Sequence, residues 1–197
     1  MRMNFCPKCG HKLDIGLVAL RERPICNPAN GGCGFIDFGR YTLGTGGLVV
    51  QTGPDGVRKA LLIQRNEEPN RGGWTIPGGF VEFDETADAA VVREVEEETG
   101  LKTRNLGLAG YRNRADPGDN SSYIVFLLEI TGGELKTEPD PEIAQVGFFT
   151  LEEMQGMGRL APLSYELAAA ALEDRIQLFQ PHTVRGLNGR PPFTLYI

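Results

Sequence analysis

A short acidic segment, GGFVEFDETADAAVVREVEEETGL at residues 78–101, constrains the fold of this chain of 197 residues more than any other stretch. Acidic residues suit the first turn of a helix, and Asp84 is a favourable N-cap. Gly100 can adopt the left-handed conformation that ends a helix, with Leu101 closing over the end. The segment therefore predicts a helix over residues 84–99 that lies between two glycine signals.

Three glutamates of this predicted helix share one face. Glu94, Glu97 and Glu98 stand at positions i, i+3 and i+4, which places them within an arc of roughly 100°. Two carboxylates about 5.5 Å apart repel by ~3 kcal/mol at an effective dielectric constant of about 20, and Arg93 can neutralise only part of that repulsion. The ordinary interpretation of such a charge run is a solvated acidic surface. A divalent cation instead turns the repulsion into affinity, so the helix predicts a site for Mg²⁺ or Mn²⁺.

The four cysteines indicate a second metal site in a separate small unit. They form the pairs Cys6-x2-Cys9 and Cys26-x6-Cys33 near the N-terminus. A Cys-x2-Cys turn directs two thiolates at one ion, and a second pair can complete a tetrahedral zinc site in a segment too short to bury a core. The second spacing is longer than usual, and unmetallated buried thiols or a redox pair are the alternatives. We predict a zinc ribbon over residues 1–40.

The sequence after the cysteine segment alternates apolar runs with turn signals. A Gly-Pro-Asp-Gly turn at residues 53–56 predicts a hairpin between the first two strands. We expect an α+β domain over residues 41–181, with helices packed on a mixed sheet, and an irregular tail over residues 182–197. Strands are expected at residues 43–51, 58–65, 106–112, 122–130 and 146–149, and a last helix at residues 162–179.

Composition excludes several classes of protein. Hydrophobic residues make up 41% of the chain, which is enough for a core. No apolar run approaches the ~18 residues that cross a bilayer, and the N-terminus lacks the apolar stretch of a secretion signal. We therefore expect a cytoplasmic protein without a membrane partner. The net charge of −6 argues against broad binding of nucleic acid, because affinity for the phosphate backbone comes mainly from clustered Lys and Arg.

The spacing of the acidic segment resembles the signature of the Nudix hydrolase family. The cysteine segment is also similar to the zinc ribbon of the NADH-pyrophosphatase and FAD-pyrophosphatase branches of that family. The resemblance covers residues 41–179 and implies a Nudix fold, which is an α/β/α sandwich around a mixed sheet. The match to the Nudix box comprises Gly79, Glu85, Arg93, Glu94, Val95, Glu97, Glu98, Gly100 and Leu101.

The resemblance implies a pyrophosphohydrolase for a nucleoside diphosphate-linked compound such as FAD, ADP-ribose or NADH, with AMP and a phosphorylated moiety as products. Glu94, Glu97 and Glu98 would bind the catalytic Mg²⁺ or Mn²⁺, with the carbonyl of Gly79 as a further ligand. Bound ions activate a water for attack on phosphorus. Glu97 or Glu98 could orient this water as the base.

The same resemblance implies roles for residues around these glutamates. Arg93 would pair with Glu85, fix the loop before the helix and support the catalytic glutamates. Some family members use a glutamate on a later loop as the base, and Glu142 is the candidate here, with an exposed loop carboxylate as the alternative. A dinucleotide pocket needs an aromatic face and cations. Candidates for these contacts are Trp74, Phe80, Tyr123, Arg65, Arg71 and Arg112, although each aromatic residue is also a candidate for the core.

Two other functions stay open. The first is hydrolysis of damaged nucleoside triphosphates to the monophosphate and pyrophosphate. The second is a non-catalytic Nudix fold that serves as a ligand sensor or nucleic-acid-binding regulator. Residues 101–122 contain nothing like the Ser-Gln-Pro-Trp-Pro-Phe-Pro segment of the NADH-pyrophosphatase branch, whereas Leu160-Ala161-Pro162-Leu163-Ser164 looks more like the FAD-pyrophosphatase branch. Many family members are dimers, so the resemblance also admits a homodimer.

Overall fold

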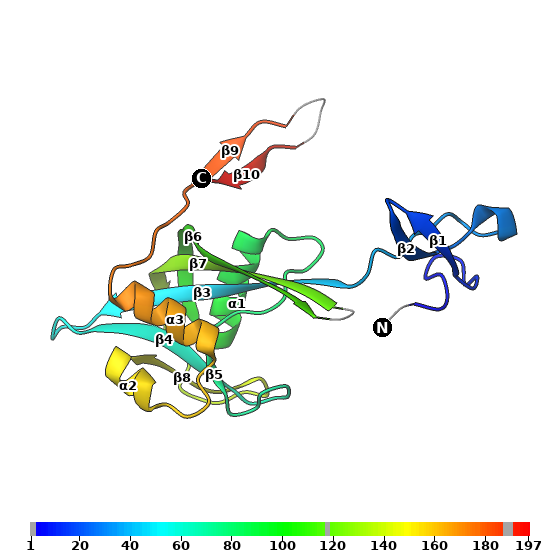
Figure 1. Cartoon of the computed structure of the whole chain (residues 1–197). Helices are drawn as coiled ribbons and strands as arrows, with labels where there is room; N and C mark the ends of the chain where they lie inside the picture. The colour runs from blue at the N-terminus through cyan, green and yellow to red at the C-terminus, as the bar shows by residue number, and fades with distance from the viewer. Residues whose placement is uncertain (1–2, 117–118, 187–190) are drawn as a thin grey trace. The chain divides into compact units, whose positions relative to one another are not determined.

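The computed structural model describes residues 3–116, 119–186 and 191–197 (Figure 1). Two units emerge from the contacts within the chain. The first comprises Met1–Thr42 and Asn113–Ser122, and the second comprises Leu43–Arg112 and Tyr123–Ile197. No helix in the described part of the chain is long and apolar enough to cross a bilayer.

A six-stranded sheet, in the order β5-β4-β3-β7-β6 with β8 also paired to β4, organises the larger unit. The predicted hairpin is present, because β3 and β4 pair antiparallel with Val50 opposite Ala60. Strands β6 and β7, which follow the acidic helix in the chain, are longer than the sequence predicted. The bounds are β3 Tyr41–Thr52, β4 Arg58–Arg65, β5 Trp74–Thr75, β6 Leu101–Asp116, β7 Asp119–Gly133 and β8 Ile143–Phe149.

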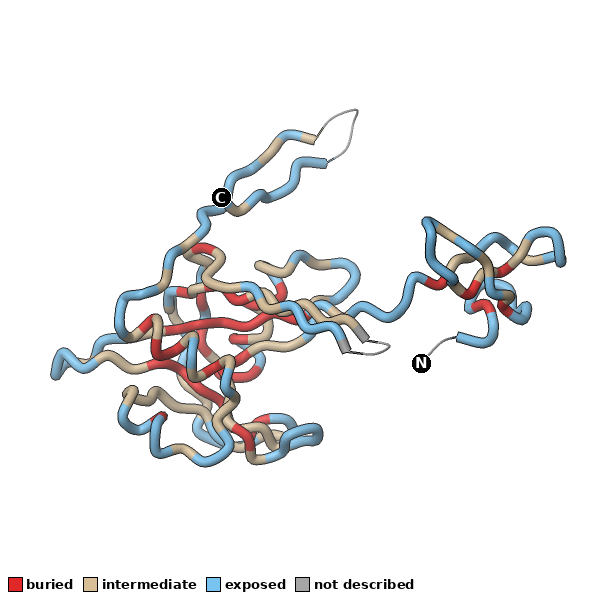
Figure 2. Tube along the Cα trace, in the orientation of Figure 1, coloured by how far each residue is buried: buried red, intermediate tan, exposed pale blue. Residues whose placement is uncertain are grey.

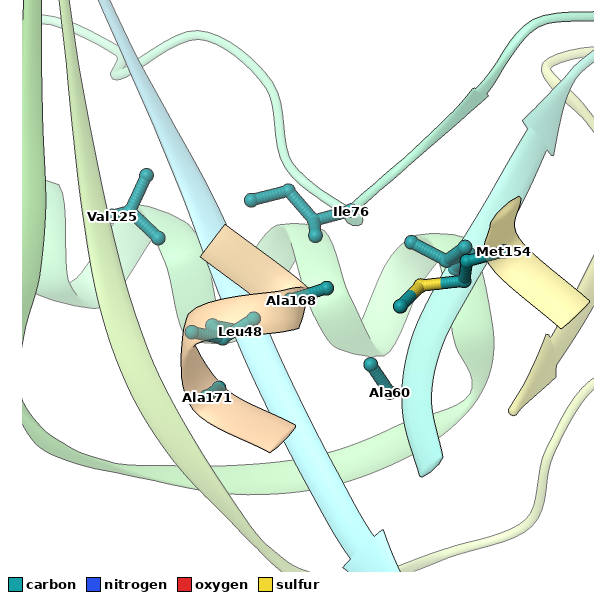
Figure 3. Packing of buried hydrophobic residues seen from close by; sticks show 8 residues of the cluster. Leu48, Ala60, Ile76, Val125, Met154, Ala168 and Ala171 are labelled. Atoms are coloured by element: carbon teal, nitrogen blue, oxygen red, sulfur yellow. The ribbon is translucent and has the colours of Figure 1, made fainter. Parts of the chain in front are cut away.

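The central strands of this sheet are largely buried (Figure 2), and their apolar side chains pack against helices on both faces. Successive residues of a strand point to opposite faces. Leu48 of β3 accordingly packs towards α2 and α3, and Val49 packs towards α1. Figure 3 shows the side chains gathered on the α3 face, among them Ala168 of that helix. The α/β/α arrangement predicted from the sequence is confirmed, with α1 at Ala87–Thr99, α2 at Leu151–Gly156 and α3 at Pro162–Leu172.

The helix boundaries differ from the prediction at two places. Helix α1 begins at Ala87 with Thr86 as N-cap, so Asp84 is not the cap. The reason is that Glu85 accepts a hydrogen bond of 3.0 Å from the amide of Glu82, which closes a turn ahead of the helix. The last helix ends at Leu172 because Arg58 donates hydrogen bonds of 3.0 and 3.1 Å to its final carbonyls.

Helix α2 was missed, although its Thr150-x-x-Glu153 capping box is visible in the sequence.

The expectation of an irregular C-terminal tail was wrong for the described residues. Strands β9 (Pro181–Val184) and β10 (Phe193–Tyr196) form an antiparallel hairpin, and residues 187–190 lie outside the description. The ring of Tyr196 packs on Phe126, with 5.4 Å between centroids. Its hydroxyl accepts a hydrogen bond of 2.7 Å from Asn105 and donates one of 3.2 Å to Asp88 in the first turn of α1. The chain end is thus fastened to the acidic helix.

The smaller unit contains the hairpin of β1 (Asp14–Val18) and β2 (Arg21–Ile25). Its buried apolar cluster consists of Cys6, Leu13 and Cys26, against which Phe35 packs. So few apolar side chains provide little burial energy, which is the situation in which small units use a metal.

Candidate active site

Two of the three candidate glutamates of α1 lie beside the glycine pair that precedes the helix. Glu98 is buried, with 8% of its surface exposed, and its Oε2 accepts a hydrogen bond of 2.7 Å from the amide of Gly78. Glu94 lies against Gly79, where a Cβ atom would stand 2.5 Å from Glu94 Oε1. Glu97 is the exposed member, with 60% of its side chain accessible. The structure therefore places two of the predicted metal ligands, Glu94 and Glu98, beside the glycine pair, whereas Glu97 is exposed and pairs with Arg93.

Close packing on β3 requires a glycine at position 78. Gly78 has a φ of 148°, and a Cβ atom there would clash with the carbonyl oxygen of Thr45. Only glycine allows the loop to pass this close to the strand. The carbonyl of Gly79 accepts a hydrogen bond of 2.8 Å from the Thr45 amide. Because a carbonyl oxygen has two lone pairs, it can still accept a cation.

Arg93 links the acidic groups around this site. The predicted ion pair with Glu85 is present at 2.6 Å, and the guanidinium also contacts Glu94 at 2.9 Å and Glu97 at 2.8 Å. It donates a further hydrogen bond of 3.4 Å to the carbonyl of Phe80. The hydrogen bonds from Arg93 and from the amide of Glu82 hold the pKa of Glu85 below its usual value. Arg93 therefore neutralises more of the acidic helix than sequence spacing suggested.

Burial is the main influence on the pKa of the Glu98 carboxyl group. Burial raises the pKa of Glu98 to about 8, the charge of Glu94 adds to the rise, and the Gly78 amide and Arg65 oppose it. Burial also raises the pKa of Glu94. A divalent cation beside these groups would favour their ionised forms. All the donors are oxygen atoms, which suits Mg²⁺ or Mn²⁺, so the residues present fit the metal that the sequence predicts.

Glu142, the other candidate base, is exposed on the loop that leads into β8. Several hydrogen bonds fix this loop. Asp140 accepts one of 2.9 Å from the amide of Glu142 and another of 2.8 Å from Lys136, and the amide of Asn66 donates to the Glu142 carbonyl at 2.7 Å. The charge of Glu142 contributes to the raised pKa of Glu98. The loop therefore stands within electrostatic range of the α1 carboxylates.

Of the predicted phosphate contacts, Arg65 is the last residue of β4 and Arg71 lies on the loop between β4 and β5. Arg65 donates a hydrogen bond of 3.1 Å to the carbonyl of Pro69, and its charge moderates the pKa of Glu98. Arg71 is exposed and donates a hydrogen bond of 3.3 Å to Asn66. Of the two, Arg65 is thus the one whose charge reaches the carboxylate site.

The three predicted aromatic contacts differ in their surroundings. Trp74 packs edge-on against Phe149, with 5.0 Å between centroids, and belongs to the apolar cluster on the α3 face. Part of its ring surface is therefore used by the core, and a role of Trp74 in ligand binding stays a prediction. Phe80 is 67% exposed on the loop after the glycine pair. Tyr123 is partly buried on β7.

Sequence reasoning missed Gly44 and Gly46 of β3, which lie beneath the ring of Tyr123. The available signal was a pair of glycines at alternate positions of an apolar strand. Glycine inside a strand indicates that another group approaches the backbone closely.

An open cavity of about 480 Å³ lies elsewhere in the larger unit. Its walls include Val50, Leu127, Ile130 and Ile176, and none of the predicted site residues lines it. The chemistry of the carboxylate site is therefore separate from this hollow.

The four cysteines of the smaller unit converge on one point. Their sulfur atoms all lie within 4.8 Å of one another, with Cys6 and Cys33 at 3.5 Å and Cys9 and Cys26 at 3.4 Å. Zn–S bonds of about 2.3 Å in a tetrahedron place sulfur atoms roughly 3.8 Å apart. The four thiols are free, and the donor set and spacing fit a zinc ion.

The long gap between the last two cysteines is absorbed by a short 3₁₀ helix, Pro28–Asn30. Asn27 caps it by accepting a hydrogen bond of 3.0 Å from the amide of Ala29, and Gly31 follows in the left-handed conformation. The amide of Cys33 then donates to the sulfur of Cys26 at 3.2 Å. The unusual spacing therefore does not prevent the second pair from facing the first.

Comparison with known proteins places the larger unit in a family. The sequence profile described as NUDIX domain matches residues 42–170. An ADP-ribose pyrophosphatase of Methanocaldococcus jannaschii is 44% identical over 98 residues, which are 49% of this chain and 57% of that protein. A Pasteurella multocida protein named NAD-capped RNA hydrolase NudC is 32% identical over 178 residues, which are 87% of this chain and 62% of that protein. The chain thus spans about three fifths of these relatives' lengths.

The fold agrees with a solved structure of the same family. A NUDIX hydrolase from Nitrosomonas europaea superimposes with a TM-score of 0.69 at 24% identity, covering 88% of this chain and 92% of that chain. The acidic helix, the glycine pair and the matched domain lead to one conclusion: this chain belongs to the Nudix family.

Proposed function

We propose that this protein is a Mg²⁺- or Mn²⁺-dependent Nudix pyrophosphohydrolase for a nucleoside diphosphate-linked compound of the ADP-ribose, FAD or NADH type. The products would be AMP and a phosphorylated moiety. The observation that carries the proposal is the placement of the buried Glu98 and the partly buried Glu94 against Gly78 and Gly79. Withdrawal from water disfavours the ionised form of both carboxylates; Arg93 balances part of this at Glu94, and bound cations would supply further positive charge at the substrate.

The residues of the site have separate tasks in this proposal. Glu94 and Glu98 would hold the cations, with the carbonyl of Gly79 as a further ligand. A divalent cation bound here would polarise the phosphoryl oxygens and lower the pKa of a water ligand. Arg93 would keep the acidic side chains in place through its three ion pairs.

Two carboxylates compete for the task of orienting the attacking water. Glu97 is favoured by its place on the same helix face as the metal ligands. Glu142 is supported by the fixed geometry of its loop and by its electrostatic influence on Glu98. Comparing the Glu97→Gln and Glu142→Gln variants separates these roles. Loss of the acidic limb of the pH profile of kcat, where activity falls as the base is protonated, is expected in the variant that lacks the base.

The proposal includes structural Zn²⁺ at the four cysteines, which the sulfur distances support. A ribbon ending near residue 40, the cytoplasmic location and the homodimer stay predictions.

A substrate panel tests the proposal. ADP-ribose is the first compound to use, because the relative of 44% identity is named for it. FAD, NADH, an NAD-capped oligoribonucleotide and 8-oxo-dGTP complete the panel, each with and without Mg²⁺. Metal-dependent AMP, or adenylate-ended RNA from the capped oligonucleotide, would support the proposal. Pyrophosphate from 8-oxo-dGTP would replace it with removal of damaged nucleotides. An absence of products despite metal binding would refute catalysis and favour a sensor.

A further inference from the structure

The loop that carries the glycine pair is held from two sides. On the β3 side, the amides of Gly47 and Thr45 each donate a hydrogen bond of 2.8 Å, to the carbonyls of Pro77 and Gly79 respectively. On the other side lies Ser164 in the first turn of α3, with only 2% of its surface exposed. The strand thus fixes carbonyl groups of this loop, and the buried amides of the loop need other partners.

The segment before α3 runs alongside β5, directly ahead of the glycine loop. Trp74 and Leu160 form a parallel bridge. The amide of Trp74 donates a hydrogen bond of 3.0 Å to the carbonyl of Arg159, and its carbonyl accepts one of 2.9 Å from the amide of Ala161. These backbone contacts bring the run at residues 160–164, which looks like the FAD-pyrophosphatase branch, against the beginning of the loop.

Ser164 completes this junction with its side chain. Its hydroxyl oxygen accepts a hydrogen bond of 3.1 Å from the amide of Ile76 and lies 2.9 Å from the hydroxyl oxygen of Thr75. Ile76 is 1% exposed and packs in the apolar cluster on the α3 face (Figure 3), so its amide depends on the serine for a partner. An alanine at position 164 would leave a buried N–H unpaired.

This bond lies two residues before an amide that holds a candidate metal ligand. The amide of Gly78 donates a hydrogen bond of 2.7 Å to Glu98. Close-packed interiors transmit small displacements, so a shift at Ile76 would move the Gly78 amide relative to Glu98. We propose that Ser164 is a positioning residue of the metal site, which acts through the amides of Ile76 and Gly78 on the orientation of Glu98. The assignment rests on the proposed function, to which the cation belongs.

Mn²⁺ binding to the zinc-loaded protein, followed by electron paramagnetic resonance, tests the assignment without requiring turnover. Ser164→Ala is expected to weaken Mn²⁺ binding roughly 10-fold, because groups that orient a metal ligand contribute at least that much to affinity. Thr75→Val removes the other hydroxyl but leaves the Ile76 amide its partner, and should bind Mn²⁺ nearly as the wild type does. An equal loss in both variants would overturn the route through Ile76.

Thr150→Ala is the matched control for a general loss of stability. It removes the side-chain cap of α2, which lies outside this junction, and should leave Mn²⁺ affinity unchanged.

Hydrogen exchange of the metal-free protein provides a readout that does not depend on a cation. In Ser164→Ala, the amides of Ile76 and Gly78 should both exchange faster relative to those of the β3–β4 hairpin. Faster exchange at Ile76 alone, with wild-type Mn²⁺ affinity, would overturn the assignment and leave the proposed function standing. Weaker Mn²⁺ binding by Ser164→Ala in a protein that hydrolyses no compound of the substrate panel would support the assignment and refute the proposed function.

Discussion

The cysteine cluster and the carboxylate cluster are both suited to metals, but they are built in opposite ways. The four sulfur atoms lie within 4.8 Å of one another in a unit with a very small apolar core. The carboxylates lie on a helix that packs through Val91 and Val95 on a full sheet, and Arg93 already balances part of their charge. The difference teaches that a zinc ion at the cysteines would stabilise the fold of the smaller unit, whereas a cation at the carboxylates would bind to a fold that is already stable.

The largest expected effect concerns the carboxylate cluster. Glu98→Gln should lower kcat by about 10³-fold, because loss of a metal ligand removes several kcal/mol of stabilisation from the transition state. The fold and the zinc content should not change. Steady-state kinetics with the selected substrate measure this, and Glu96→Gln, at an exposed position of the same helix, is the control. Equal losses in both variants would contradict the assignment of one metal-binding face.

A substitution in the cysteine cluster should change the structure of the smaller unit rather than the catalytic activity. Cys26→Ser should release zinc and unfold residues 3–40, because their apolar cluster is too small to persist without a metal. Zinc analysis and hydrogen exchange resolved by segment measure the change. The sheet of the larger unit should keep its protection. Retention of one zinc per chain with unchanged exchange would show that the four sulfurs are not the ligands.

The carboxylate cluster should also make the stability of the protein depend on pH. The pKa of Glu98 is about 8 in the folded protein against 4.5 for the free group, so between these values the folded state retains a proton that the unfolded state has lost. Without Mg²⁺, the contribution of Glu98 to the free energy of unfolding should therefore be fully present below about pH 4.5. It should decrease between about pH 4.5 and 8, by at most about 1.4 kcal/mol per pH unit, and be lost above that range.

Urea unfolding from pH 5.5 to 8.5 measures this slope. Saturating Mg²⁺ should flatten it, because the cation stabilises the ionised carboxylate in the folded state, and Glu98→Gln should flatten it without metal. A slope of the same size in Glu98→Gln would assign the proton to another group.

The smallest effect concerns the fastening of the chain end to the acidic helix. Tyr196→Phe removes a hydroxyl that bonds Asn105 and Asp88, and should cost about 1 kcal/mol of unfolding free energy. This corresponds to a decrease of about 2–4 °C in Tm for a chain of this size. Thermal unfolding with Tyr41→Phe, at an exposed position, as control measures it. Equal shifts in the two variants would show that the hydroxyl does not anchor the hairpin.

Local sequence signals were sufficient for the features that depend on neighbouring residues. The shared face of Glu94, Glu97 and Glu98 follows from the period of a helix, and the hairpin of β3 and β4 follows from its turn. The long spacing between Cys26 and Cys33 left the second half of the cysteine site open, because the 3₁₀ turn that closes it depends on an Asn27 cap.

Features that depend on distant contacts could not be predicted. The start of α1 was placed too early because Glu85 is used by Arg93 and by a turn, so this segment does not join the helix. The C-terminal hairpin was missed because Tyr196 is anchored by Phe126, which is far away in the sequence. Core packing of Trp74 was likewise set by a distant ring.

Titration with Mn²⁺, followed by electron paramagnetic resonance on the zinc-loaded protein, tests the distinction between the two clusters most directly. The wild-type protein should bind Mn²⁺, Glu98→Gln should bind it at least about tenfold more weakly, and Cys26→Ser should bind it as the wild type does. Unchanged Mn²⁺ affinity in Glu98→Gln, or loss of Mn²⁺ binding in Cys26→Ser, would contradict the account.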